Sequence, residues 1–357
     1  MKKKIKNLIF KKFYIPNYLI NKEIPIKKEN SKLLIYYKKT KKIIHDKFYN
    51  INKYINNKNI IIRNNTKVFV SKIIGKKEKN NSNIEIFLIK EINPYYHIWD
   101  VLVKPARKVR VGNKIIFNIN KKKKLYSEII NNTTSKGRLL KFIFKKGKNF
   151  KLKKILYKIG KIILPDNIKK KYLKNLKLNI LQNIYAKNYG SIYLPNEGIH
   201  FSKNTFLKFK LKKIKIFDIT LHLNLNSFIN ININNINKYK IHSEKLIIKK
   251  KISNNINKEI KKKKKICCIG INTLKGIESI VKYDKIKPFN GNINTLINYP
   301  LKIRIIDSLI TNFLNTNNLS FITLSSFCGY KNIINIYKEA IKNKYKFLNY
   351  GDVLLIK

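Results

Sequence analysis

The chain has 357 residues and a formal net charge of +62, and 44% of its residues are hydrophobic. This apolar content suffices for a buried core and excludes a chain disordered by composition, and the length suits one large or two modest domains. The charge favours a polyanionic partner, because lysines near phosphates release condensed counterions. Mutational drift towards A+T-rich codons produces the same bias, since Lys, Asn and Ile dominate and Arg occurs only five times.

The first 150 residues contain short apolar runs but no long helical period. Leu33–Tyr37 and Ile60–Ile62 predict buried strands. Between residues 67 and 150, turn-prone stretches separate six further runs, which predict a small antiparallel barrel or sandwich. These runs are Val68–Val70, Ile84–Ile89, Trp99–Val103, Lys114–Ile119, Tyr126–Ile130 and Leu139–Phe144.

The second half of the chain alternates between helical and strand patterns, which predicts an α/β domain. Strands are expected at Asp218–Leu223, Ile266–Gly270 and Phe321–Ser325, and helices at Tyr172–Tyr185, Leu274–Val281 and Ile333–Tyr345. Lysine-rich stretches such as 249–265 are interpreted as solvated loops and polar helix faces. The predicted fold class is therefore an α/β domain with a mixed sheet and helices (residues 1–66 and 151–357) that carries an inserted antiparallel β-barrel domain (residues 67–150).

Histidine is scarce, and three of the five histidines, His200, His222 and His242, lie in compact motifs of the second half. His200 and His222 fit a strand end followed by a turn, where α/β domains place ligand groups. For each histidine a packed or surface role is the alternative. A metal site formed by the three histidines is a second alternative. Because no ligand spacing such as HExxH occurs, no metal is expected.

Other sequence features bear on ligands and compartment. Gly270–Thr273 follows an apolar run and opens a predicted helix, so its backbone N–H groups are a plausible binding position for an anion. Three cysteines without CxxC spacing, Cys267, Cys268 and Cys328, argue against a zinc site or a disulfide framework and fit a reducing cytosol. No run of about 18 uncharged apolar residues predicts a transmembrane helix. The basic N-terminus is interrupted by Lys and Tyr and precedes no small-residue cleavage site, so no signal peptide is expected.

Ten motifs occur in a set order over about 320 residues: Ser31–Leu34, Asn64–Val68, Trp99–Lys108, Gly137–Leu140, Gln182–Ala186, Pro195–Phe201, Thr220–Phe228, His242–Glu244, Asp307–Phe313 and Tyr350–Asp352. In this order they resemble the S-adenosylmethionine:tRNA ribosyltransferase-isomerase family of queuosine biosynthesis. The family patterns include W-x-V-L-x-K-P-A-R-R, P-T-A-G-L-H-F, T-L-H-V-G-x-G-T-F and M-H-S-E. Each match is weak alone, and their order makes the resemblance specific.

The resemblance implies an α/β domain with an inserted β-barrel and a tRNA-modifying enzyme. That enzyme transfers and isomerises the ribosyl moiety of S-adenosylmethionine onto 7-aminomethyl-7-deazaguanine at the tRNA wobble position, which gives epoxyqueuosine, adenine and methionine. S-adenosylmethionine is then a co-substrate, and the expected partner is tRNA with a GUN anticodon (Asp, Asn, His and Tyr type). We expect a cytoplasmic monomer that does not associate with membranes.

This chemistry needs a base near the ribose carbon next to the sulfonium and an acid for the departing adenine, and histidine can serve in either role. The resemblance places His200, His222, His242 and Glu244 in the catalytic site. For Asp307 and Asp352 the alternative is a carboxylate that serves a turn or cap. For Lys67, Lys104, Arg107 and Lys275 the alternative is a solvated surface charge. The expected substrate-binding residues are Asn64, Thr66, Lys67, Lys104, Arg107, Gly198, Phe201, Thr220, Lys275, Asp307, Asn312, Phe313 and Asp352.

Several residues depart from the family pattern. Lys67 and Lys275 stand where the pattern has arginine, which keeps the charge but loses bidentate geometry. Asn196 and Glu197 replace a Thr-Ala pair and put a carboxylate beside the expected pocket, and Leu314 replaces a histidine. Two alternatives therefore stay open: a catalytically decayed family member that binds tRNA without turnover, and a basic RNA-binding protein without catalysis.

Overall fold

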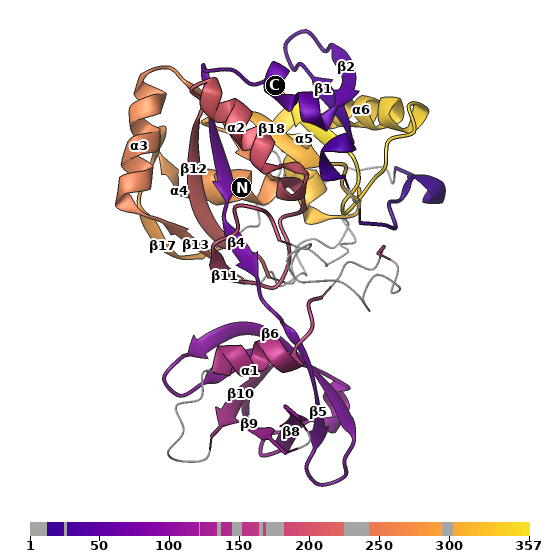
Figure 1. Cartoon of the computed structure of the whole chain (residues 1–357), viewed down its shortest axis with the longest axis vertical. Helices are drawn as coiled ribbons and strands as arrows, with labels where there is room; N and C mark the ends of the chain where they lie inside the picture. The colour runs from indigo at the N-terminus through magenta and orange to yellow at the C-terminus, as the bar shows by residue number, and fades with distance from the viewer. Residues whose placement is uncertain are drawn as a thin grey trace, which may run out of the picture. The chain divides into compact units, whose positions relative to one another are not determined.

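The computed structural model describes residues 13–24, 27–120, 122–133, 137–144, 152–163, 167–168, 182–224, 243–294 and 303–357. The chain divides into two compact units, whose elements are shown in Figure 1. The first unit comprises residues 1–67, 165–189 and 194–357, and the second comprises residues 68–164 and 190–193. Compared with the predicted boundaries, the second unit also takes in residues 151–164 and 190–193.

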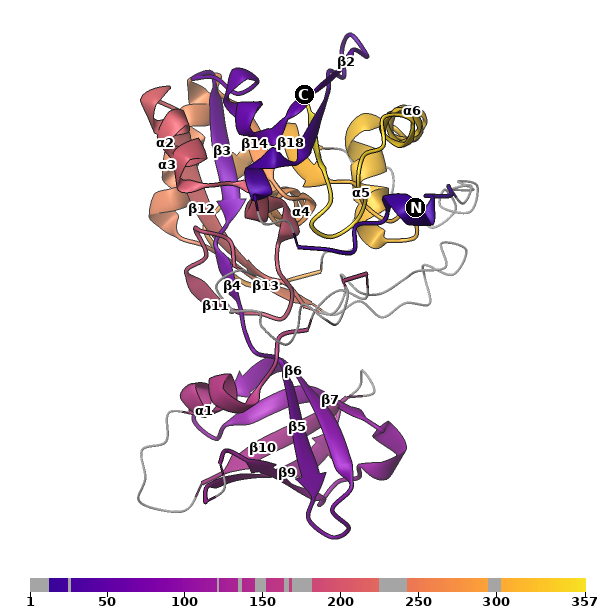
Figure 2. The same cartoon turned by 45° about the vertical axis from the view of Figure 1, so that its right-hand side comes forward.

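A nine-stranded mixed sheet forms the centre of the first unit, with the strand order β17-β13-β12-β3-β14-β18-β19-β1-β2. Strands β12, β3, β14 and β18 are parallel neighbours, and β3, β14 and β18 are seen side by side in Figure 2. Their carboxyl ends therefore meet at one edge of the sheet. The strands are β1 (Lys32–Tyr36), β2 (Ile43–Lys47), β3 (Asn59–Asn64), β12 (Lys215–His222), β13 (Glu244–Ile248), β14 (Lys265–Ile269), β17 (Phe289–Ile293), β18 (Ile306–Asn312) and β19 (Val353–Ile356).

The helices of the first unit pack their apolar residues against this sheet. On one face, Phe201 and Phe209 share a core with strand residues such as Ile61 and Ile310. Helix α2 starts with a capping box between Ser202 and Thr205. The α-helices are α2 (Lys203–Leu211), α3 (Lys250–Lys261), α4 (Ile271–Ile280), α5 (Leu319–Cys328) and α6 (Tyr330–Lys342), and the short elements are η2 (Asn17–Leu19), η3 (Lys28–Asn30), η4 (Phe48–Lys53), η8 (Asn196–His200), β15 (Val281–Lys282) and β16 (Lys285–Ile286).

Most element predictions for this unit are confirmed. The expected strands that became β1, β3, β12 and β14, and the expected helices that became α4 and α6, are all present. The predicted strand Phe321–Ser325 is wrong, because this segment lies inside helix α5, which is buried on nearly all sides. A short, β-branched apolar run fits a buried helix as well as a strand. In the predicted helix Tyr172–Tyr185, residues 172–181 lie outside the described residues, and residues 182–185 include a turn.

The second unit contains a closed barrel of six strands in the order β10-β7-β6-β5-β8-β9, with every pairing antiparallel. Alternate residues point inward, and helix α1 (Leu152–Ile159) adds Leu152 and Leu156 to the barrel core. The barrel strands are β5 (Lys72–Lys77), β6 (Asn83–Asn93), β7 (Ile98–Lys104), β8 (Lys114–Asn118), β9 (Lys124–Asn132) and β10 (Arg138–Ile143), and η5 (Ala106–Lys108) follows β7. The predicted fold class, an α/β domain with an inserted antiparallel barrel, is confirmed.

One barrel strand was assigned to the wrong segment. The predicted run Val68–Val70 is not a barrel strand, because strand β4 (Thr66–Val68) pairs with β11 (Asn188–Ser191). Phe69 and Val70 nevertheless pack into the barrel core. The missing strand is β5, where only Ile73 and Gly75 face inward between lysines. A glycine at an inward position hides the alternation that marks a strand. Across the described residues, no helix combines the length and apolarity that a membrane crossing requires.

Candidate active site

Candidate residues gather at the carboxyl edge of the four parallel strands. β3 ends at Asn64, β12 ends at His222 and β18 ends at Asn312. Helix α4 starts directly after β14, and β13 starts at this edge with Glu244, next to the end of β12. The short helix η8 adds His200 and contacts β18. Open α/β sheets bind ligands outside the carboxyl ends of their strands, so this edge is the candidate site.

His200 is fully buried, and both of its ring nitrogens have protein partners. Nε2 lies 3.0 Å from Asn312 Nδ2, and Nδ1 lies 3.1 Å from Ser31 Oγ and 3.3 Å from the Lys28 carbonyl. Asn312 Nδ2 also donates to the carbonyls of residues 351–352, which sets the amide orientation and leaves His200 Nε2 as an acceptor. Burial lowers the pKa of His200 to about 4. The ring is therefore a neutral link between η8, β18 and the segment before β1.

His222 differs from His200 because it is only partly buried. Its Nδ1 lies 2.8 Å from Thr66 Oγ1, and its Nε2 has no hydrogen-bond partner among the described residues. Burial, and then the positive charge of Lys245, lower the pKa of His222 to about 4. Near neutral pH this histidine is therefore an uncharged imidazole, and among the described residues only its Nδ1 has a hydrogen-bond partner.

Two carboxylates and one ammonium group are buried at the same edge. Glu197, Glu244 and Lys275 each expose 6% or less of their surface. Burial lowers the pKa of Lys275 to about 8, and the negative charges of Glu244 and Glu197 oppose this shift. Glu244 accepts a hydrogen bond of 3.1 Å from the backbone N–H of Asn224, two residues after His222.

Glu197 occupies the N-terminus of helix α4. Its carboxylate accepts a hydrogen bond from the backbone N–H of Ile271. It lies so close to Gly270 that a Cβ there would be 3.2 Å from Glu197 Oε2, and Gly270 has a φ of 92°. Burial raises the pKa of Glu197, and these backbone contacts and Lys275 oppose the rise. The predicted anion-binding position at Gly270–Thr273 is therefore occupied by a carboxylate of the chain itself.

Two expected substrate-binding residues, Asn64 and Thr220, form hydrogen bonds within this edge. Asn64 Nδ2 donates to the Leu221 carbonyl at 2.8 Å, and Asn64 Oδ1 accepts from the backbone N–H groups of Leu221 and Thr66. Thr220 Oγ1 donates to Asn65 Oδ1 at 2.7 Å. These bonds tie the ends of β3 and β12 together and thereby place Thr66 beside His222.

Three further expected contacts are tightly packed. Phe201 stacks on Phe206 in the core below α2. Phe313 is completely buried and makes edge contacts with aromatic rings that include Tyr337. Gly198 sits where a Cβ would collide with the Tyr185 hydroxyl and the Asn183 amide. All three shape the structure around η8 and β18.

Asp307 and Asp352 both accept hydrogen bonds from backbone N–H groups. Asp307 Oδ2 accepts from the backbone N–H of Ile266 at 2.8 Å, at the amino ends of β14 and β18, so the structure does not bring it to the candidate site. The two carboxylate oxygens of Asp352 accept from the backbone N–H groups of Lys32 and Lys346 at 2.6 and 2.7 Å. Asp352 therefore anchors the chain before β1 and β19.

The remaining predicted cations lie on β4 and around the end of β7. Lys67 is half-buried in β4, with Nζ 4.6 Å from the centre of the Tyr189 ring. Lys104 and Arg107 are exposed at the end of β7 and in η5, in the second unit. His242 lies outside the described residues. Ser31, which contacts His200, was missed as a site residue although it opens the first of the ordered motifs.

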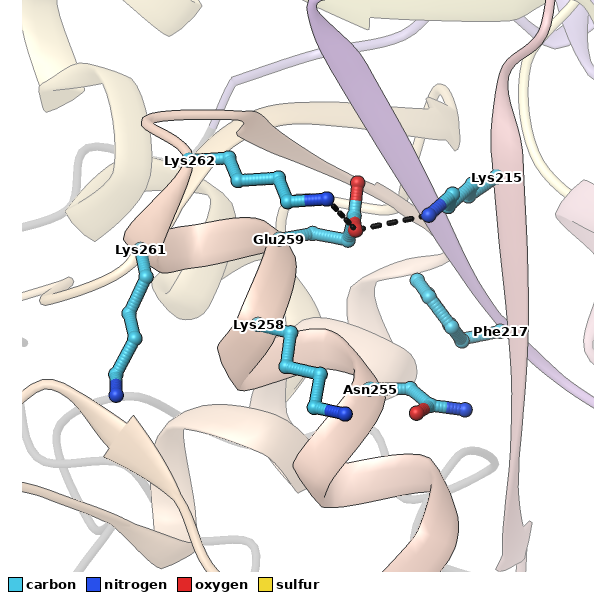
Figure 3. Close-up of a pocket in the computed structure, with 7 residues that line it drawn as sticks. All are labelled: Lys215, Phe217, Asn255, Lys258, Glu259, Lys261 and Lys262. Atoms are coloured by element: carbon cyan, nitrogen blue, oxygen red, sulfur yellow. Dashed lines mark hydrogen bonds and ion pairs between the residues drawn. The ribbon is translucent and has the colours of Figure 1, made fainter.

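A separate pocket lies beside β12 at the other end of that strand (Figure 3). Its buried carboxylate, Glu259, contacts Lys215 Nζ at 2.9 Å and Lys262 Nζ at 3.6 Å. Phe217 forms one wall. The pocket lies at the amino end of the parallel strands and contains none of the predicted site residues.

Comparison with known proteins agrees with the order of the motifs. The chain matches the queuosine biosynthesis protein family over residues 10–356. It belongs to this family. It is 36% identical to the S-adenosylmethionine:tRNA ribosyltransferase-isomerase of Amoebophilus asiaticus and 35% identical to that of Cytophaga hutchinsonii, and in each case 97% of this chain and 98% of the relative are covered.

A solved structure of a family relative has the same fold. The S-adenosylmethionine tRNA ribosyltransferase from Thermotoga maritima superposes with a TM-score of 0.54 at 20% identity, covering 97% of this chain and 99% of that one. The resemblance inferred from the motifs is thus confirmed. In the described parts of the chain, His, Cys, Asp and Glu side chains form no group of three that could hold a metal ion.

Proposed function

We propose that the chain is a tRNA-modifying transferase that uses S-adenosylmethionine as a co-substrate. It transfers and isomerises the ribosyl moiety onto 7-aminomethyl-7-deazaguanine at the wobble position of tRNA and releases adenine and methionine, with epoxyqueuosine as the product. The observation that carries the proposal is the near full-length similarity to relatives named for this activity. The carboxyl edge of the sheet, with its available imidazole, agrees with it.

His222 is the acid-base residue of this proposal. A hydrogen bond from Nδ1–H of its neutral ring to Thr66 Oγ1 would leave the lone pair on Nε2, where it can take a proton from the ribose carbon next to the sulfonium. His200 is a positioning residue, because both ring nitrogens are already engaged. Glu244 is a positioning residue as well, because it holds the backbone of Asn224 just after His222. Lys275 is the candidate contact for the methionine carboxylate.

The tRNA partner follows from the same proposal. We infer tRNA with a GUN anticodon as the substrate, and a monomer working in the cytoplasm, where tRNA is modified. Lys104 and Arg107 are exposed cations in a long family motif, which suits contacts to phosphate groups. Lys67, next to the strand end that carries Thr66, is a third candidate for such a contact.

The test incubates the purified chain with S-adenosylmethionine and tRNA that carries 7-aminomethyl-7-deazaguanine, followed by mass spectrometry of the digested nucleosides. The expected result is epoxyqueuosine together with free adenine, and none of either with tRNA that carries guanine. Binding of tRNA in a gel-shift assay without any product would instead support the decayed family member. That alternative draws on Glu197, whose carboxylate occupies the start of α4.

His222→Gln tests the assigned role. We expect turnover to fall by about 100- to 10,000-fold, the usual contribution of a general acid-base group, while tRNA binding is kept. Lys258→Gln, in the pocket of Figure 3, is the control for a general effect of substitution. Unchanged turnover in His222→Gln would remove this residue from the chemistry.

A further inference from the structure

Two exposed aromatic side chains lie in the turn that joins strands β6 and β7 of the barrel (Figure 2). Tyr95 is 81% exposed and Tyr96 is 54% exposed. Their rings meet edge to face, with centroids 4.8 Å apart, and neither ring belongs to the apolar core that the described residues of the barrel form. We call residues 94–97 the aromatic turn. The packing of the barrel does not account for its two tyrosines, and a cluster of exposed apolar side chains is typical of an interaction site.

The backbone of the aromatic turn is held by hydrogen bonds at both ends. Asn93 Oδ1 accepts a hydrogen bond of 3.0 Å from the backbone N–H of Tyr96. The carbonyl of His97 accepts one of 3.1 Å from the backbone N–H of Phe142 in β10. Because the turn is formed in the free protein, a ligand pays little entropy for ordering it. Tyrosine adds a large contact area at a low cost in side-chain entropy, since it has only two rotatable side-chain bonds.

The unit that carries the aromatic turn is strongly basic. Between residues 68 and 164 the sequence has 25 lysines and arginines against five acidic residues, a net charge of +20. Glu91, the last acidic residue before the turn, is paired with Lys153 Nζ at 3.3 Å. Positive charge attracts phosphates, and every nucleic-acid base has a flat face that stacks on an aromatic ring. This combination favours an RNA strand with unpaired bases over an apolar protein surface as the occupant of the turn.

We propose that Tyr95 and Tyr96 form a stacking subsite for unpaired bases of the tRNA substrate. This inference rests on the proposed function and deepens it, because it adds a place where bases rather than phosphates are bound. The aromatic turn precedes β7, whereas Lys104 ends this strand and Arg107 follows it. The seven residues of β7 span about 20 Å. The stacking subsite and the candidate phosphate contacts therefore lie at opposite ends of one strand of the barrel.

Filter binding with two RNAs tests the subsite, without S-adenosylmethionine so that no turnover occurs. One RNA is an unmodified tRNA transcript with a GUN anticodon, and the other is a blunt RNA duplex without unpaired bases. For the double variant Tyr95→Ala/Tyr96→Ala we expect the affinity for tRNA to fall by about 5- to 150-fold, the range for losing one stacked base. The affinity for the duplex should stay the same. Tyr283→Ala, which removes a 91% exposed tyrosine between β15 and β16 of the first unit, is the matched control and should leave both affinities unchanged.

Two further comparisons separate stacking from other kinds of contact. Phenylalanine at both positions keeps the ring faces and should keep the affinity for tRNA, whereas leucine at both positions keeps apolar bulk without a ring and should lose as much affinity as alanine. The slope of log affinity against log salt concentration should be unchanged in the alanine variant, because no phosphate contact is removed. Arg107→Gln, by contrast, should reduce the size of this slope by about one.

Three results would overturn the stacking subsite: full affinity for tRNA in the alanine variant, an equal loss of affinity for the duplex, or full affinity in the leucine variant. Thermal unfolding checks that the variants are folded, and an unchanged melting temperature is expected because both rings lie outside the barrel core. A wild-type chain that binds tRNA through these rings but forms no product contradicts only the proposed function. A wild-type chain that forms product, with an alanine variant that keeps full affinity for tRNA, contradicts only the subsite.

Discussion

Acidification should destabilise the first unit through His200. Histidine in an unfolded chain has a pKa of about 6.5, whereas burial lowers the pKa of His200 in the folded state to about 4. The folded state therefore binds this proton less well than the unfolded state does. The stabilising contribution is fully present above about pH 6.5 and is lost as the pH falls through about 4.

The size of this effect follows from the shift. One pKa unit corresponds to about 1.4 kcal/mol, so the shift to about 4 is worth about 3 kcal/mol of unfolding free energy. The side chain is completely buried, so little of this is screened by solvent. An effect of this size is a large part of the stability of a typical domain.

The assay is urea unfolding of the wild type and of His200→Gln between pH 7 and pH 4, followed by circular dichroism. Glutamine keeps a polar side chain but does not titrate, so the variant should lose less stability over this range. The difference between the two slopes isolates His200 from other titrating groups, including His222. Parallel slopes would mean that His200 titrates at its ordinary pKa in the folded state, which would refute the burial argument.

Three other predictions concern single contacts. Lys245→Met removes a positive charge that lowers the pKa of His222, so the acid limb of the pH-rate profile should move to higher pH, and an unmoved limb contradicts this. Gly75→Ala places a Cβ 2.7 Å from barrel core side chains, so urea unfolding should show a free energy of unfolding lower by about 1–3 kcal/mol. Ile74→Ala, on the exposed side of the same strand, should not show this loss. Glu278→Ala removes the buried acceptor for three backbone N–H groups and the partner of Arg304, so we expect the free energy of unfolding to fall by about 3–5 kcal/mol. A melting temperature within 2 °C of wild type, roughly the shift for a loss of less than 1 kcal/mol, would count against this prediction.

Much of the fold could be predicted because the relevant signals are local. The buried run Ile60–Ile62 and the amphipathic stripe of α6 reflect the period of one element, which a sequence displays directly. Phe321–Ser325 was misassigned because the burial of α5 on nearly all sides erases its helical period. The sequence does not reveal strand β5 because Gly75 contributes no side chain to the alternation. The reason for the glycine, its contact with Phe117 of the neighbouring strand β8, is tertiary.

The sequence alone determined the family, because ten motifs in a set order need no structure to be recognised. It also named His200, His222 and Glu244 as members of one site. Only the tertiary structure separated the two histidines, since burial and the hydrogen bond to Asn312 come from segments more than a hundred residues apart in the chain.

The same holds for the carboxylates. In the sequence Asp307 is a candidate ligand group and Glu197 a carboxylate beside the expected pocket. In the structure one accepts a hydrogen bond at the amino end of β14 and the other lies at the start of α4. The direction in which each strand runs, and therefore the edge at which its acid is placed, is decided by how the strands pair. That pairing depends on contacts between distant segments, so the sequence alone does not show at which edge each carboxylate lies.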